Sequence, residues 1–484
     1  MRRDSRHVLQ LTNLTPQHPR GLRAPLAFLA LAAAAYGSAQ PSAAIWLASL
    51  AGLWVAALLS PPGKGVSLTP LGLAVFTFAG WIVLSNELFN PSYAAAAPFH
   101  AAFLLGGFLL ARQKDAAPLY RVALLGALVL SVWALLQFAR GERAHALFDT
   151  PATLAATLNL VLLPGLAYWL WKDRGTLLGP GLTFLACALA ATQSRGGWLA
   201  FGSGLIALML LSRRSGLRIN PRLVWTAAVL VAGGLALSMR SGVSGQARLA
   251  LYDTAMQAMQ APLTGSGYLS FYYHLEPVRL SVSGYSDSTT YFVHNDYLQV
   301  LLELGVPGLL GLLAIVILPV LLAWKALPKL GDEEKVMCVG VAAAIVATAT
   351  HALVDYPFYI PACLLLFGAA LGLIDFHVAS DGRRLHKLAK PVVTALSLWV
   401  LVTPVLAEAA AEHAQRQWRN RDAESAAYWF EFARRVTPRD WRYHWYAGQF
   451  WQTVALGGNP RAAELSAAAF AAGRAANSRE VRLR

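Results

Sequence analysis

Three side chains in this sequence combine a reactive type with a suggestive position: Arg195, Arg248 and His294. Arg195 lies in the segment TQSRGGW (192–198), which joins two apolar runs. A planar guanidinium can bond two phosphate oxygens at once, and neighbouring glycines allow close backbone approach. The alternative interpretation is an interfacial arginine that reaches the lipid headgroups. Arg195 is therefore a candidate phosphate-binding residue.

Arg248 opens an amphipathic stretch that continues through Tyr252 towards a glycine turn, LTGSGY (263–268). Its guanidinium has the same affinity for phosphate oxygens, so Arg248 is a second candidate for binding phosphate, with Tyr252 in support. The alternative is an ordinary solvated arginine at the start of a helix.

His294 begins the segment HNDYLQVLLELG (294–305), just before a return to apolar sequence. Imidazole is the side chain best matched to proton transfer near neutral pH, which makes His294 a candidate general base. Asp296 or Glu303 could orient it or stabilise its charge, and spacing does not decide between them. The alternative is a structural histidine, which is the commoner role of a single histidine.

A further histidine and aspartate lie close together later in the chain. His351 and Asp355 are four residues apart, which places them on one face of a helix near the end of an apolar run. They either pair with each other or line the same site. The glycines at 265 and 267 lack the Lys-Ser/Thr of a nucleotide-binding loop, and no acidic pair with metal-ligand spacing stands out, so the sequence predicts no metal and no cofactor.

The elements that must position these residues are membrane helices. Hydrophobic residues make up 56% of the 484 residues and charged residues only 13%, whereas a soluble globular chain is about 25% charged. This composition excludes a disordered chain, a soluble enzyme and a coiled coil. Long continuous apolar runs predict an all-α polytopic membrane protein and not a β-barrel. Three cysteines within apolar runs indicate neither disulfides nor a metal site.

The hydropathy pattern predicts about 12–13 transmembrane helices. If the N-terminus is inside, the inner segments hold 21 Lys and Arg and the outer loops between spans hold 6, which fixes a cytoplasmic N-terminus. The net charge of +15 then reflects cytoplasmic loops facing membrane lipids, and not nucleic-acid binding. The predicted spans are 26–39, 43–59, 71–85, 98–111, 119–138, 153–171, 177–192, 197–212, 223–238, 306–324, 336–354, 358–375 and 391–408.

Two long hydrophilic segments fall on the outer side, which in a Gram-negative cell is the periplasm. The second is amphipathic and aromatic, either a tetratricopeptide-like helical tail or a small helical cap; Phe432 and Phe470 are 38 residues apart, not the 34 of that repeat. The predicted organisation is a cytoplasmic tail (1–24), transmembrane helices 1–9 (25–238), a large periplasmic catalytic loop (239–305), transmembrane helices 10–13 (306–408) and the periplasmic helical tail (409–484).

Taken in order, these segments resemble the O-antigen ligase family, which also contains O-antigen polymerases and pilin-type protein O-glycosyltransferases. The ordered set is more specific than any single piece, and it covers about the middle third of the chain. The matching pieces are SRG at 194–196, Arg248 with Tyr252, PLTGSG at 262–267, HNDYL at 294–298 with Glu303, and His351 with Asp355.

The resemblance implies an inner-membrane glycan transferase with its active site in the periplasm. The donor would be a glycan on undecaprenyl pyrophosphate, bound through its pyrophosphate by Arg195 and Arg248. His294 would deprotonate an acceptor hydroxyl, which attacks the anomeric carbon with inversion and without a metal. The acceptor would be lipid A-core, with a growing glycan or a protein as alternatives. Two guanidinium groups would stabilise the charge that grows on the leaving pyrophosphate.

Two other classes of function fit part of the pattern. A transporter of lipid-linked glycans predicts symmetric halves and polar residues in mid-span, and the sequence has neither. A non-catalytic scaffold whose tail recruits partners would make His294 dispensable.

Overall fold

The computed structural model describes most of the chain, and its regular structure is helical apart from one antiparallel pair of two-residue strands, β1 (Ser67–Leu68) and β2 (Arg383–Arg384). The described residues are 33–34, 43–58, 67–90, 96–112, 117–172, 178–218, 232–234, 245–259, 261–275, 292–378, 383–384 and 389–478.

Seven described helices are long and apolar enough to cross a membrane, which makes the chain a multi-pass membrane protein. The predicted spans 26–39 and 223–238 lie almost wholly outside the described residues, so the total of 12–13 stays a prediction. The seven are α3 (Pro70–Phe89), α5 (Ala117–Ala139), α6 (Pro151–Trp171), α8 (Arg195–Ser215), α12 (Asp296–Ala326), α13 (Asp332–His351) and α14 (Pro361–Val378). Shorter apolar helices are α2 (Ala43–Leu58), α4 (Ala96–Ala111) and α7 (Leu178–Ala191).

Polar caps fix where the site-bearing helices begin. The Ser194 hydroxyl accepts a hydrogen bond from the Gly197 amide at 3.0 Å, which starts α8 at Arg195. The Asn295 side chain accepts from the Leu298 amide at 3.1 Å, which starts α12 shortly after His294. Such caps satisfy amides that have no partner within the helix. Arg195 thus lies at the start of α8, and His294 lies two residues before the start of α12.

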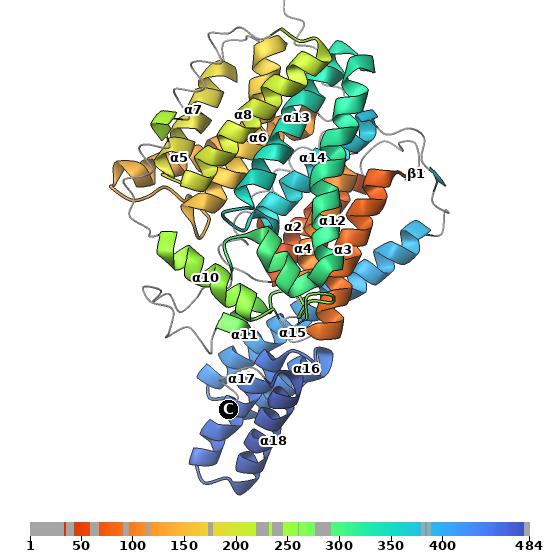
Figure 1. Cartoon of the computed structure of the whole chain (residues 1–484). Coiled ribbons are helices and arrows are strands. Elements are labelled where there is room, and N and C mark those ends of the chain that lie inside the picture. The colour runs from red at the N-terminus through yellow and green to blue at the C-terminus, as the bar shows by residue number, and fades with distance from the viewer. Residues whose placement is uncertain are drawn as a thin grey trace, which may run out of the picture.

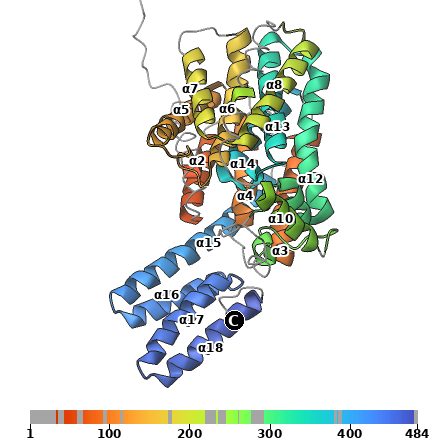
Figure 2. The same ribbon diagram turned by 60° about the vertical axis from the view of Figure 1, so that its left-hand side comes forward.

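Close helix packing in the bundle depends on small residues. A Cβ at Gly107 of α4 would lie 2.1 Å from the Leu365 carbonyl oxygen of α14, and one at Gly368 would lie 2.2 Å from that of Leu104. Backbones approach this closely in membranes only where glycine or other small residues face each other. Figures 1 and 2 show α4 and α14 inside the bundle, with α6, α8 and α13 alongside.

Helix α12 begins ten residues before the predicted span 306–324, at Asp296. Its first part, Asp296–Leu304, is separated from the rest by Gly305, whose φ of 66° and ψ of −167° are not helical. Hydropathy missed this part because it carries Asp296, Gln299 and Glu303, which are all fully buried. The predicted periplasmic loop therefore contains a helix at its end, besides α10 (Gly245–Gln257) and α11 (Phe271–Leu275).

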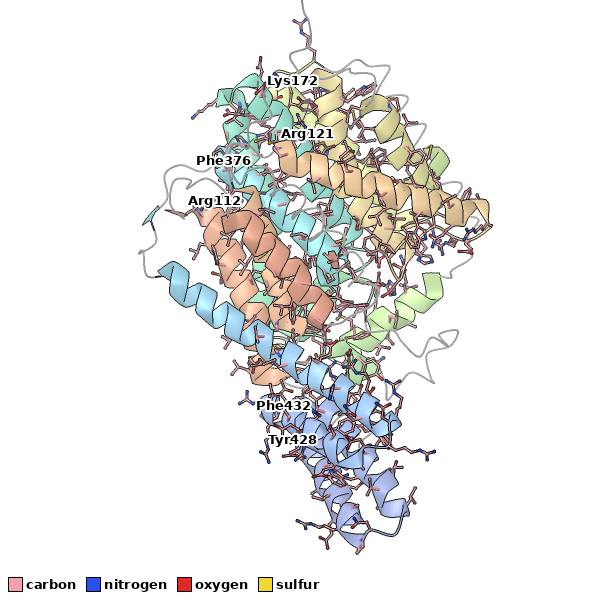
Figure 3. The ribbon with its side chains drawn as sticks, turned by 180° about the vertical axis from the view of Figure 1, so that it is seen from behind. Arg112, Arg121, Lys172, Phe376, Tyr428 and Phe432 are labelled. Atoms are coloured by element: carbon pink, nitrogen blue, oxygen red, sulfur yellow. The ribbon has the colours of Figure 1, made fainter. Side chains whose placement is uncertain are left out.

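The last four helices include a tail: the first of them starts alongside α2 and α4 (Figure 3), and its end projects with the other three from one end of the bundle, called here the tail end (Figure 2). Helices α10 and α11 lie at this end (Figure 1), whereas Lys172 and Arg121 lie towards the opposite end, away from Tyr428 and Phe432 of the tail (Figure 3). The four helices are α15 (Ala389–Arg419), α16 (Ala423–Val436), α17 (Trp441–Leu456) and α18 (Pro460–Ala476).

An aromatic and alanine core holds the tail together. Phe430 and Phe450 are buried in it, with ring centroids 5.4 Å apart, beside Ala414 and Ala469. Arg439 of the tail lies 3.3 Å from the Glu87 carboxylate at the end of α3. An exposed ion pair of this kind contributes little stability, about 0–1 kcal/mol, so it serves as a contact and not as an anchor.

Candidate functional site

His294 and Asp355 form the centre of the candidate site. The His294 Nδ1 atom lies 3.2 Å from Asp355 Oδ1, although the two residues are 61 positions apart. The His294 ring also packs edge-on against Tyr356, and the Tyr252 hydroxyl donates a hydrogen bond to the His294 carbonyl oxygen at 3.0 Å. His294 has a φ of 59°, a strained conformation for a residue with a side chain. The surrounding contacts hold this imidazole in a defined position.

Asp355 is held as an anion. Burial acts to raise its pKa, but the hydrogen bond from His294 and the charges of His294, His351 and Arg248 outweigh burial and leave the pKa below its usual value. An ionised carboxylate only accepts hydrogen bonds, so the His294 Nδ1 atom must donate. The other ring nitrogen, Nε2, is then the basic one, and it is available for a proton from a substrate.

Arg195 is the first residue of α8 and is exposed at the tail end. The next residue, Gly196, packs on the turn that leads to Asp355: a Cβ there would lie 2.9 Å from Val354 Cγ2 and 3.2 Å from His351 Nε2. The absence of a side chain at Gly196 allows this approach, and it brings the Arg195 backbone next to the turn that leads to Asp355. The positive end of the α8 dipole adds to the attraction for an anion.

Arg143, between α5 and α6, is a further cation at the site that the sequence analysis did not single out. Its Nη2 atom lies 3.4 Å from the Thr192 carbonyl oxygen and 3.5 Å from that of Gln193, just before Arg195. Burial and then the charge of Arg195 lower the pKa of Arg143. The positive charges of Arg143 and Arg195 therefore repel each other, and a bound anion would relieve that repulsion. The sequence signal that could have identified Arg143 is its place in a predicted outer loop between two spans.

Arg248 lies on α10 and is half-buried. Its positive charge counteracts burial at Tyr252, whose pKa is raised, and it also lowers the pKa of Asp355. Arg248 therefore lies within electrostatic reach of the His294–Asp355 pair. A small apolar core positions α10 against α11 and the first part of α12; it comprises Leu251, Ala255, Phe271, Val293 and Leu302.

The other two acidic candidates, Asp296 and Glu303, bind partners other than the His294 imidazole. Asp296 accepts a hydrogen bond from the Phe358 amide at 2.9 Å, and its own amide donates to the Ala352 carbonyl, so it ties the start of α12 to the segment around Asp355. Glu303 accepts four hydrogen bonds in a second buried network. Asp355, and neither of these, is the carboxylate that contacts the His294 imidazole.

His351 lies beneath the pair and is fully buried. Its Nε2 atom lies 3.8 Å from Asp355 Oδ2, which is beyond hydrogen-bond distance. Asp355 therefore has an imidazole near each of its two oxygens, and whether His351 pairs with Asp355 or lines the site stays a prediction. Among the described residues no group of three or more His, Cys, Asp or Glu is arranged to hold a metal ion.

Residues 180–313 match a family model described as O-antigen ligase. The chain carries an O-antigen ligase domain. The matched segment contains Arg195, Arg248 and His294, and it ends before Asp355. No curated protein matches the chain. The match of this segment to O-antigen ligases points to a transferase enzyme that uses a lipid-linked glycan donor and an acceptor.

Proposed function

We propose that this O-antigen ligase family protein moves a glycan from undecaprenyl pyrophosphate to an acceptor hydroxyl at the periplasmic face of the inner membrane. One observation carries the proposal: the His294–Asp355 pair, at 3.2 Å, lies at the same end of a membrane bundle as Arg195 and Arg248. A base beside cations suits an acyl or glycosyl transfer in which the leaving group is anionic. The family match selects glycan transfer.

In this proposal His294 removes the proton of the acceptor hydroxyl. The oxygen attacks the anomeric carbon of the donor, the bond from that carbon to the pyrophosphate oxygen breaks, and the electron pair leaves with undecaprenyl pyrophosphate. The proton moves to His294 Nε2, and Asp355 stabilises the resulting imidazolium through Nδ1. A positioned general base of this kind contributes about 10²- to 10⁴-fold to the rate.

The arginines act on the leaving group. Negative charge on the pyrophosphate increases as the glycosidic bond breaks, so Arg195 and Arg248 bind the transition state more tightly than the ground state. Arg143, which the charge of Arg195 perturbs, would supply a third cation at the same place. The guanidinium fork suits pyrophosphate because it can bond two oxygens of one phosphate.

The periplasmic placement of the site is supported by the distribution of basic residues along single helices. Helix α8 begins at Arg195 in the site and has Arg213 and Arg214 in its last turn, and α12 begins beside His294 and has Lys325 in its last turn. Basic residues collect on the cytoplasmic side of membrane proteins. The opposite end, with the site and the tail, would then face the periplasm, and the prenyl chain would remain in the bilayer.

The acceptor we favour is lipid A-core, to which the donor glycan is transferred in one step. A growing glycan and a protein are the alternative acceptors, and the tail at 409–484 is the segment we expect to choose between them. The tail is a packed helical unit beside the site end, joined to α3 through Arg439 and Glu87. Such a unit can hold an acceptor without taking part in the chemistry.

The test is a glycan profile of ligase-deficient cells that accumulate lipid-linked O-antigen. Wild type, His294→Ala and His377→Ala would be expressed at matched membrane levels; His377, in the last turn of α14, is the control. We expect the wild type and His377→Ala to restore the lipopolysaccharide ladder and His294→Ala to leave it absent. A ladder with His294→Ala would refute the base, and no ladder with the wild type would refute lipid A-core as acceptor for that donor.

A further inference from the structure

We propose that Glu303 and Gln299 form a hydrogen-bonded relay that sets the position of the Arg248 loop relative to His294, so that both are positioning residues for the transfer reaction; the Arg248 loop is here α10, which carries Arg248, together with the turn 261–270 and α11. The inference rests on the proposed function. It assigns Glu303 a place in the mechanism other than orienting the imidazole directly, and it brings in Gln299, a residue that carries no signal in the sequence.

Glu303 is fully buried, and four donors satisfy its carboxylate. Oε2 accepts from the Leu269 amide at 2.8 Å and from the Tyr359 hydroxyl at 2.7 Å. Oε1 accepts from the Phe271 amide at 3.1 Å and from Gln299 Nε2 at 3.1 Å. A buried carboxylate is tolerated when its oxygens receive such donors. Each oxygen thus holds one amide of the segment that follows α10.

Gln299 continues the chain of hydrogen bonds on the other side. It lies one helical turn before Glu303 and is also fully buried. While its Nε2 donates to Glu303, its Oε1 accepts from the Val293 amide at 2.9 Å. Val293 directly precedes His294. A continuous set of hydrogen bonds therefore runs from residues 269–271, through Glu303 and Gln299, to the backbone beside the base.

The same part of α12 holds the turn between α10 and α11. The Ser266 amide donates to the Leu302 carbonyl at 3.1 Å, the Gly267 amide to that of Glu303 at 2.8 Å, and the Val306 amide to that of Pro262 at 2.9 Å. The first two bonds use carbonyls of α12, and the third uses an amide of α12, that the break at Gly305 frees from the helix. The relay and this turn together attach the Arg248 loop to α12, the helix that follows His294.

Position matters because the two groups act on opposite sides of one carbon: His294 on the entering oxygen and Arg248 on the leaving pyrophosphate. A misplacement of about 1 Å far from the chemistry can cost about 10²-fold in rate. Loss of the relay is therefore expected to lower transfer strongly while the membrane bundle stays folded.

The experiment exchanges the two relay side chains. In Glu303→Gln, the new amide group faces the Leu269 amide or the Phe271 amide, so one buried donor loses its acceptor. In Gln299→Glu, two carboxylates face each other. In the double variant, Gln at 303 can donate to Glu at 299, which still accepts from Val293, so the link between the two side chains is restored although the Phe271 amide stays without its acceptor. We expect a loss of about 10- to 100-fold in transfer for each single variant and a partial recovery in the double variant, above the rate of the worse single variant.

A control variant separates the relay from general stability. Asp253→Ala breaks a Gln–carboxylate bond of the same spacing, Gln257 Nε2 to Asp253 Oδ2 at 2.7 Å, on the exposed face of α10. It should transfer within about threefold of the wild type, since it is a surface substitution that leaves the relay intact. Melting temperature in detergent is measured for every variant.

The outcomes separate a failure of the proposed function from a failure of the relay alone. A wild type that transfers no glycan from undecaprenyl pyrophosphate refutes the proposed function. A wild type that transfers, together with single variants at the wild-type rate or a double variant no better than the worse single, overturns the relay alone. If Glu303→Gln does not fold, Gln299→Leu gives the same test, because it removes both ends of the link; a folded Gln299→Leu with wild-type transfer overturns the relay.

Discussion

Replacing Gly265 with alanine should detach the Arg248 loop from α12. Gly265 has a φ of 77°, and a Cβ there would lie 2.2 Å from the Glu303 carbonyl oxygen and 2.6 Å from the Gly305 nitrogen. These are backbone atoms, which cannot rotate away as a side chain can. The left-handed conformation costs alanine about 1–2 kcal/mol, and the two neighbouring bonds, from the Ser266 and Gly267 amides, contribute about 0.5–1.5 kcal/mol each.

The total of about 3 kcal/mol corresponds to a shift on the order of 100-fold towards the detached loop. We therefore expect Gly265→Ala to lower the rate of glycan transfer on the order of 100-fold and to make the loop more sensitive to proteolysis. The assay is transfer by purified protein, with limited proteolysis in parallel.

Gly141→Ala is the matched control, because Gly141 has a φ of 86° and no atom within 4 Å of the added Cβ. It pays the conformational cost alone, about 1–2 kcal/mol, and has no docked loop to lose. If Gly265→Ala and Gly141→Ala transferred at the same rate, the argument that the loop docks on the break in α12 would be wrong.

The remaining predictions concern the site and the tail. Asp355→Asn should lower transfer by up to about 10⁴-fold, measured as single-turnover rate, because a neutral amide no longer fixes the tautomer of His294. The pKa of Asp355 is lowered in the folded protein, so the stability that its ionised form contributes is present at neutral pH. This stability is lost only as the pH falls below about 4, the usual pKa of an aspartate. Melting temperatures measured between pH 5 and 8 should therefore not change through the titration of Asp355. Arg195→Lys and Arg248→Lys should not restore the donor use that Arg→Ala removes, since a point charge lacks the bidentate fork; wild-type turnover with lysine at both sites would contradict planar recognition. Deletion of 409–484 should change acceptor choice, and loss of transfer to every acceptor by a folded variant would count against that role.

Much of the scaffold follows from the sequence. The apolar runs predict the membrane helices, and Ser194 and Asn295 have the residue types that begin helices, so the starts of α8 and α12 have local causes. The order of Arg195, Arg248 and His294 in the sequence also identifies the matched family segment. These signals are local, and each is visible within a short window.

The partner of the base could not be predicted, because it depends on packing between helices. Asp355 lies 61 residues from His294, whereas Asp296 and Glu303 are close in sequence and attract attention for that reason. Glu303 is instead buried among four donors, of which three come from other segments of the chain. The early start of α12 was missed because buried polar residues lower its hydropathy.

The central claim is that His294, oriented by Asp355, is the base for transfer from a pyrophosphate-linked donor. The most direct measurement is the single-turnover transfer rate of purified wild type and His294→Ala, with undecaprenyl-pyrophosphate-linked glycan and lipid A-core, alongside the affinity of each for undecaprenyl pyrophosphate. The account predicts a loss of about 10²- to 10⁴-fold in rate with affinity unchanged. Transfer by His294→Ala at the wild-type rate would contradict it.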